Sequence, residues 1–174
     1  MRPALFYKLV AKPAVDIFDP KFNSREAHAM ILAIGLQESD FRSRQQLIGG
    51  VRDWWKSERG PAVSFFQFER VGIRGVLEHK ASEQLATDLL LMFSYPPDVE
   101  VVFQALKHHD LLSAAFARLA LWRIPDRLPA QCEMWDGWRQ YLRVWAPGKP
   151  KIDKWEQNWN LAWRIVNGDD SGWL

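Results

Sequence analysis

The sequence predicts a mainly α-helical protein that folds as one domain over residues 1–174, and three observations support this. Apolar residues recur three and four positions apart in several segments, which is the period of a helix with one buried face. No segment alternates apolar and polar residues for long enough to form a large sheet. The chain is 48% hydrophobic and 25% charged, which suits a single packed core and argues against disorder.

The best-marked helix is expected from residue 23 to about residue 40. Asn23 can cap its N-terminus, and Glu26 three residues later can reach back to the cap, as in a capping box. An apolar stripe with helical spacing follows, formed by Ala27, Met30, Ile31 and Ile34. Residues 1–22, which precede this helix, are expected to be an irregular or short helical lead-in.

Prolines and glycines divide the rest of the chain into segments. Residues 42–64 are interpreted as a long loop or two short irregular pieces, and residues 62–68 as a short strand or the start of a helix. The remaining helices are expected at residues 81–94, 98–121, 131–145 and 153–167, the second of these as one helix or a pair.

Tryptophan is concentrated near the C-terminus. Seven of the ten tryptophans lie in the last 40 residues, at Trp135, Trp138, Trp145, Trp155, Trp159, Trp163 and Trp173. Three of them repeat every fourth residue and therefore share one helix face, which predicts that they lie in the core. The alternative is that they stack on sugar rings or on bases.

The composition argues against several functional classes. The single cysteine, Cys132, excludes an intramolecular disulfide and favours folding in a reducing compartment. The N-terminal apolar run is broken by Lys8, Lys12 and Pro13, so no signal peptide is expected. No stretch approaches ~20 uninterrupted apolar residues, so no membrane insertion is expected. The net charge of only +2 argues against a tryptophan-rich nucleic-acid binder, which needs a basic groove.

Glu38 is the main candidate for chemistry. It follows Ile34 by four residues and Ile31 by seven, so the apolar stripe of the helix runs directly into this carboxylate. Desolvation and the negative end of the helix dipole are both expected to raise its pKa. A carboxylic acid that stays protonated near neutral pH is what protonation of a glycosidic oxygen requires. The alternative is that Glu38 points to water at a frayed helix end.

Two stretches of the sequence carry a resemblance to known enzymes. Residues 34–41 read Ile-Gly-Leu-Gln-Glu-Ser-Asp-Phe and resemble the Glu-Ser-x-Phe helix end of soluble lytic transglycosylases and goose-type lysozymes. Residues 58–69 read Glu-Arg-Gly-Pro-Ala-Val-Ser-Phe-Phe-Gln-Phe-Glu and are similar to the goose-type stretch Asp-Arg-Gly-x-Gly-x-Gly-Leu-Met-Gln-x-Asp. The resemblance, which covers roughly residues 24–77, implies a lysozyme-like domain with a short irregular or β segment beside the active-site cleft.

The resemblance also implies roles for individual residues. Glu38 corresponds to the catalytic acid, next to Ser39 on the substrate side. Glu58 and Glu69 stand where the goose-type enzymes have assisting aspartates, and Gln67 would line the glycan cleft.

Three aromatic residues complete the predicted substrate site. Phe66 stands within the glycine-containing motif of the families. Residues 117–125 stand where the families have Ala-Tyr-Asn-Ala-Gly, with Leu121 and Trp122 in place of the Tyr-Asn pair. In those families the tyrosine hydroxyl helps to orient the acid and the sugar, which leucine cannot do. Trp54 is interpreted either as a stacking wall for a sugar ring or as a core plug under a long loop.

A second carboxylate decides between two reactions. A lytic transglycosylase needs only one acid, whereas an inverting hydrolase also needs a carboxylate that positions water, roughly 6.5–9.5 Å from the acid. Asp40 is a poor choice, because residues two apart on a helix do not face each other. Glu69, with Glu58 at the other end of the same stretch, narrowly favours hydrolysis. The alternative is that both are solvated loop acids.

The resemblance implies a muramidase that cleaves the β-1,4 bond between N-acetylmuramic acid and N-acetylglucosamine, by hydrolysis or by lytic transglycosylation, without a metal or organic cofactor. Such an enzyme without a signal peptide suits a bacteriophage endolysin or a virion-associated lysozyme. It would be made in the cytoplasm and act on the cell wall after release or within a virion. Its expected partners are glycan strands and other virion proteins. The alternative is a non-catalytic phage structural or wall-binding protein that reuses a lysozyme fold. The altered third motif, at residues 117–125, favours this alternative.

Overall fold

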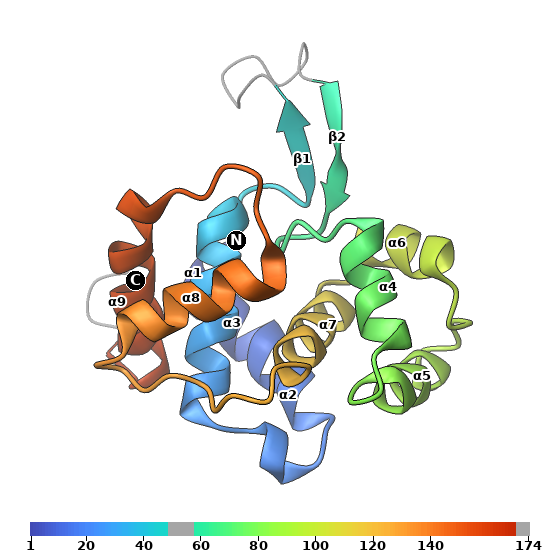
Figure 1. Ribbon diagram of the computed structural model, residues 1–174, viewed down its shortest axis with the longest axis horizontal. Coiled ribbons are helices and arrows are strands. Elements are labelled where there is room, and N and C mark those ends of the chain that lie inside the picture. Colours follow the sequence, from blue (N-terminus) through green and yellow to red (C-terminus); the bar gives the residue numbers. More distant parts are fainter. Residues whose placement is uncertain (49–57, 170–174) are drawn as a thin grey trace.

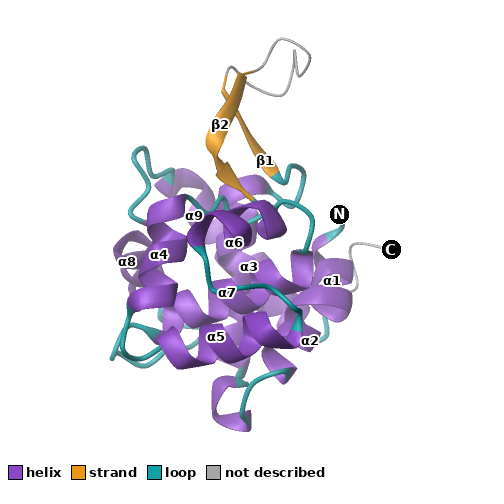
Figure 2. Cartoon of the chain, turned by 90° about the vertical axis from the view of Figure 1, so that its right-hand side faces the viewer, coloured by secondary structure: helices purple, strands orange, loops and turns teal. Residues whose placement is uncertain are grey.

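The structure is a computed structural model that describes residues 1–48 and 58–169 (Figure 1). It is mainly helical, and the two strands in the described ranges form a hairpin that projects from the helical body (Figure 2). The predicted fold class is therefore confirmed at the level of a mainly α protein. Within the described ranges, no helix combines the length and the apolar character that a membrane span requires.

The described elements have the following bounds in chain order. The helices are α1 (Pro3–Phe6), a π-helical turn (Tyr7–Ala11), α2 (Lys12–Asp16), a 3₁₀ turn (Pro20–Phe22), α3 (Arg25–Ser39), α4 (Arg70–Glu78), α5 (Glu83–Met92), α6 (Val99–Leu106), α7 (Asp110–Trp122), α8 (Met134–Trp145) and α9 (Ile152–Val166). The strands are β1 (Gln45–Ile48) and β2 (Glu58–Val63), which pair antiparallel. The lead-in, expected to be irregular or a short helix, forms α1, the π-helical turn, α2 and the 3₁₀ turn, and residues 98–121, expected as one helix or a pair, form the pair α6 and α7.

Helix α3 is the central element of the body, with every residue from Ala27 to Leu36 buried. It packs mainly against α9 and also against α7 and the π-helical turn. Its cap is Ser24, whose Oγ accepts a hydrogen bond from the backbone N–H of Ala27 at 3.2 Å. The prediction of Asn23 as the cap is wrong by one residue, because the Asn23 side chain instead contacts Asp16 and His28.

Helix α4 was not predicted from the sequence. It carries only two buried residues, Ile73 and Val76, and contains Gly72 and Gly75, which are poor helix formers. The helix forms because those two side chains pack inward, next to α5, α6 and α7. Tertiary packing therefore overrides a weak local preference in this segment.

The tryptophans of α9 form part of the core, as predicted. Trp155 and Trp159 are fully buried, and Trp163 is nearly so. The indole N–H of Trp155 donates to the Met134 carbonyl at 3.1 Å, and that of Trp159 donates to the Gln131 carbonyl at 2.9 Å. These bonds connect α9 to the start of α8 and to the loop before it. Helix α8 contributes residues to the candidate site described next.

Candidate active site

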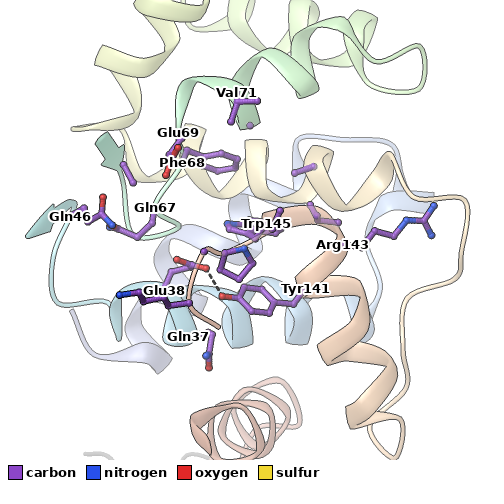
Figure 3. Close-up of a pocket in the computed structure, with 18 of the residues that line it drawn as sticks. Gln37, Glu38, Gln46, Gln67, Phe68, Glu69, Val71, Tyr141, Arg143 and Trp145 are labelled. Atoms are coloured by element: carbon purple, nitrogen blue, oxygen red, sulfur yellow. Dashed lines mark hydrogen bonds between the residues drawn. The ribbon is translucent and has the colours of Figure 1, made fainter. Parts of the chain in front are cut away.

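An open cleft of about 860 Å³ lies between the base of the hairpin, the start of α4 and the end of α8 (Figure 3). Its wall also includes the last turn of α3 and the C-terminal end of α7. Segments from five regions of the chain therefore meet at one cavity, a geometry typical of small-molecule and polymer binding sites.

Glu38 occupies the last turn of α3 and lines this cleft. The helix ends there because Asp40 and Phe41 adopt left-handed conformations, with φ of 52° and 51°. The Phe41 ring folds back under α3 beside Gly35, where a Cβ atom would lie only 2.4 Å from it. Gly35 thus permits the sharp chain reversal that leaves Glu38 at the edge of the core.

A tight turn at residues 64–67 forms the adjacent wall. Val63 and Phe68 close it with two backbone hydrogen bonds of 2.9 and 2.7 Å. Ser64 has a φ of 66°, a conformation that glycine adopts without strain, and the resemblance places a glycine at this position. The Ser39 hydroxyl donates to the Phe65 carbonyl at 2.7 Å, which ties this turn to the end of α3.

Burial raises the pKa of Glu38 from its ordinary value of 4.5 to about 7. A hydrogen bond from the Tyr141 hydroxyl, at 2.7 Å from Oε1, acts in the opposite direction because it favours the ionised form. The Glu69 carboxylate raises the pKa again by charge repulsion. Glu38 can therefore carry a proton near neutral pH, as its position at the end of the apolar stripe predicted.

Tyr141 is a site residue that the sequence analysis missed. It comes from α8, is buried, and stacks on Trp155 with ring centroids 5.3 Å apart and an interplanar angle of 17°. The spacing of Trp138, Tyr141 and Trp145 on a predicted helix marks one apolar face that contains a single hydroxyl. That spacing could have identified the residue, although not its partner. Tyr141 thus supplies a hydroxyl to Glu38 from α8.

Three further residues shape the cleft around Glu38. Glu69, at the N-cap of α4, is exposed and lies across the cleft from Glu38 in Figure 3. Gln67 lines the cleft as predicted, and its side-chain amide donates to the Ser64 carbonyl at 2.7 Å. Trp145, at the end of α8, also lines the cleft and donates from its indole N–H to the Phe66 carbonyl at 2.9 Å. An acid, a second carboxylate and an aromatic ring therefore share one cavity.

Two of the predicted substrate-binding residues lie elsewhere. Phe66 is fully buried and packs against Phe6, because the turn at 64–67 directs this side chain into the core. Trp122 packs against Phe22 with ring centroids 4.1 Å apart and lines a different pocket, because α7 turns it away from Glu38. Both assignments to the cleft are therefore wrong.

The three remaining predicted site residues are Ser39, Glu58 and Trp54. Ser39 holds the turn at 64–67 and is not among the residues that line the cleft. Glu58 begins β2 opposite Ile48, but its side chain lies outside the described part of the structure. Trp54 also lies outside the described residues.

The rim of the cleft carries positive charge. Arg123, Arg143, Lys149 and Lys151 line it together with the two glutamates. Arg143 forms an ion pair with Asp126 at 2.7 Å, and burial lowers the pKa of Arg123. Among residues 1–48 and 58–169, no cluster of three or more His, Cys, Asp or Glu side chains is arranged to hold a metal ion.

The chain matches no protein-family model, no curated protein and no solved structure. It is a mainly helical protein with an open cleft, a carboxylic acid that is protonated near neutral pH, and a second, exposed carboxylate beside it.

Proposed function

We propose that this protein is a peptidoglycan muramidase with a lysozyme-like fold, and that Glu38 is its general acid. The observation that carries this proposal is the state of Glu38. Its pKa lies near 7, and it lines an open cleft of about 860 Å³ together with other polar side chains. Ordinary surface glutamates are ionised at that pH and cannot deliver a proton to a leaving group.

The proposed chemistry begins with proton transfer from Glu38 to the glycosidic oxygen between N-acetylmuramic acid and N-acetylglucosamine. Tyr141 holds the Glu38 carboxyl in one orientation through the 2.7 Å hydrogen bond. Trp145 offers an aromatic face for a sugar ring, and Gln67 offers an amide for its polar groups. No cofactor takes part in this reaction.

The position of Glu69 favours hydrolysis over lytic transglycosylation. An inverting hydrolase places a carboxylate on the far side of the sugar to activate water, and Glu69 lines the same cleft on the opposite wall. If Glu69 has this role, the products end in a reducing N-acetylmuramic acid. Products that end in 1,6-anhydromuramic acid would assign the protein to the transglycosylases instead.

The proposed setting is the bacterial cell wall. The substrate is the glycan strand, and the enzyme is a bacteriophage endolysin or a virion-associated lysozyme whose further partners are other virion proteins. It reaches the wall on release from the host cell or within a virion. These assignments rest on the resemblance of residues 34–41 and 58–69 to soluble lytic transglycosylases and goose-type lysozymes.

The second candidate is a non-catalytic wall-binding or virion structural protein with the same fold. The observation in its favour is the third motif, where Leu121 is buried and Trp122 points away from the cleft. The same cleft would then bind glycan without cleaving it. The muramidase releases soluble fragments from this substrate, whereas the binding protein releases none.

The test is incubation of purified cell wall with the wild-type protein and with Glu38→Gln, followed by zymography and mass spectrometry of the released muropeptides. We expect wild type to release them and Glu38→Gln to lose at least ~10²-fold in rate, the usual scale for a general acid. Glu156→Gln, which changes an exposed carboxylate on α9 outside the cleft, is the matched control and should keep full activity. Binding to cell wall without release by wild type would favour the non-catalytic function.

A further inference from the structure

Arg118, in the middle of α7, is a buried cation without an anionic partner. Only 3% of the residue is exposed. Its Nε donates to the Phe22 carbonyl at 2.9 Å, whereas its buried Nη1 has no hydrogen-bond partner. In the described part of the chain, no carboxylate lies within ion-pair distance of this guanidinium.

Such a group is costly to bury, because an ionised side chain loses its hydration and gains nothing equivalent. Burial lowers the pKa of Arg118 to about 10, so it still carries its charge at neutral pH. The guanidinium carbon lies 5.3 Å from the Phe22 ring centroid and 5.2 Å from the Trp122 ring centroid. These cation–π contacts stabilise the charge in part, but they supply no counter-charge.

Arg118 also lines a second cavity, of about 680 Å³, which shares no lining residue with the active-site cleft. Its wall combines the indole of Trp122 with apolar side chains such as Leu128, and Lys21 adds a second cation. We call this cavity the Arg118 pocket. A buried guanidinium beside an apolar, aromatic wall is suited to a ligand with an anionic head and an apolar body.

The carboxylates of the Arg118 pocket do not neutralise Arg118. Asp126 is paired with Arg143 at 2.7 Å, and Arg127 is paired with Glu133. Glu26 lines the pocket but forms no ion pair with Arg118. After these pairings, Lys21 and Arg118 face the single carboxylate of Glu26, so the pocket retains a positive charge.

We propose that the Arg118 pocket binds a small organic anion. A carboxylate or phosphate head pairs with the Arg118 guanidinium, and an apolar or aromatic body lies against Trp122 and Leu128. The guanidinium suits both heads because its N–H groups match two oxygens of an oxyanion. The ligand supplies the counter-charge that the folded chain lacks. This binding is independent of the muramidase activity, because the cavity lies apart from Glu38.

The experiment uses two anions and a neutral analogue on the full-length protein. Benzoate, phenyl phosphate and benzyl alcohol are titrated into protein labelled with ¹⁵N-arginine, and affinities are measured by calorimetry. We expect the anions to shift the Arg118 Nε–H signal, which Arg118→Met assigns by its loss. The anions should bind at least about tenfold more tightly than benzyl alcohol, as expected for a charged hydrogen bond. The tighter of the two anions identifies the head as carboxylate or phosphate.

Two variants make the result decisive. Arg118→Met keeps the side-chain bulk and should lose about tenfold or more in anion affinity. Leu128→Trp narrows the cavity without touching the buried charge and should also weaken benzoate binding. Arg74→Met, on the exposed face of α4, is the control and should bind as wild type does. An unshifted Arg118 signal, or equal affinity for benzyl alcohol and benzoate, would overturn the proposal.

Discussion

Glu38 is subject to three local influences on its pKa, and two of them come from side chains that can be changed singly. Burial has the largest effect and raises the pKa to about 7. The Tyr141 hydroxyl stabilises the ionised carboxylate, whereas the Glu69 carboxylate destabilises it. The two residues therefore affect the proton affinity of Glu38 in opposite directions.

We predict that Tyr141→Phe and Glu69→Gln shift the pKa of Glu38 in opposite directions. Loss of the hydroxyl should raise it, and loss of the negative charge should lower it. The Glu38 carboxyl carbon, followed by ¹³C NMR over pH, measures both shifts without any assumption about activity. If the protein cleaves glycan, the alkaline limb of the pH–rate profile should move the same way in each variant. Shifts of the same sign in both variants would contradict this arrangement.

Glu38→Gln should change stability in a pH-dependent manner. Folding raises the pKa of Glu38 from 4.5 to about 7, so the folded state disfavours its ionised form. The wild type carries no such penalty below pH 4.5, acquires it between pH 4.5 and about 7, and keeps it above that. Glutamine carries none at any pH. The variant should therefore gain stability relative to wild type as pH rises, by at most about 3 kcal/mol.

Urea unfolding at pH 4 and at pH 8 measures this difference. A stability difference that is the same at both pH values would show that Glu38 titrates in the folded protein as it does in the unfolded chain.

At the scale of elements, the site depends on how α3 ends. Gly35 lies one turn before Glu38 and leaves the space that the Phe41 ring occupies. The chain reversal at Asp40 and Phe41 then brings the turn at 64–67 against the helix end, where Ser39 bonds to it. One glycine thus allows the close contact between two segments that form the cleft wall.

Gly35→Ala should destabilise the protein by about 1–3 kcal/mol, the usual range for overpacking a filled core. The added methyl would lie 2.4 Å from the Phe41 ring, so the ring or the helix end must move. Any glycan cleavage should fall as well, because Glu38 moves with the helix end. Gly148→Ala, where the new methyl meets nothing within 4 Å, is the control for thermal unfolding and should stay near wild type. Equal melting temperatures for both variants would contradict this packing argument.

The position of the site also depends on the contact between α8 and α9. Trp159 is fully buried against Gly137, where a Cβ atom would lie 2.6 Å from the indole ring. This close approach keeps α8, and with it Tyr141, in place over Glu38. The structural role of these tryptophans is therefore linked to the position of the site.

Trp159→Ala should cost about 3–5 kcal/mol, because it removes a large buried side chain and leaves a cavity. Trp135→Ala is the matched control, since Trp135 is 56% exposed and its loss should cost little. Chemical denaturation of both variants tests the difference. A wild-type unfolding midpoint for Trp159→Ala, together with weaker glycan binding, would instead support a sugar-stacking role.

At the scale of the whole molecule, the helical body supports two separate cavities on either side of the end of α7. Ala120 and Arg123 line the active-site cleft, whereas Arg118 and Trp122 line the Arg118 pocket. The Asp126–Arg143 ion pair joins residues of the two walls. The same helix thus contributes residues to both the proposed catalytic cleft and the proposed anion site.

The sequence by itself determined the elements that have strong local signals. The stripe before Glu38 predicted α3 and the raised pKa of its last carboxylate, and the spacing of the α9 tryptophans predicted their burial. These features depend on residues within a few turns of one another, which helical periodicity reveals directly. The hairpin, by contrast, was predicted only as a short irregular or β segment without strand bounds, because its short strands carry no clear alternation.

Only the tertiary structure decided which side chains surround Glu38. Tyr141 lies 103 residues away in the chain and reaches the acid because the tryptophans of α9 hold α8 in place. Phe66 and Trp122 belong to segments near the site, yet the turn at 64–67 directs Phe66 into the core, and helix α7 directs Trp122 into a different pocket. The direction of a side chain is set by packing between distant elements, and a pattern in one local segment carries no information about that packing.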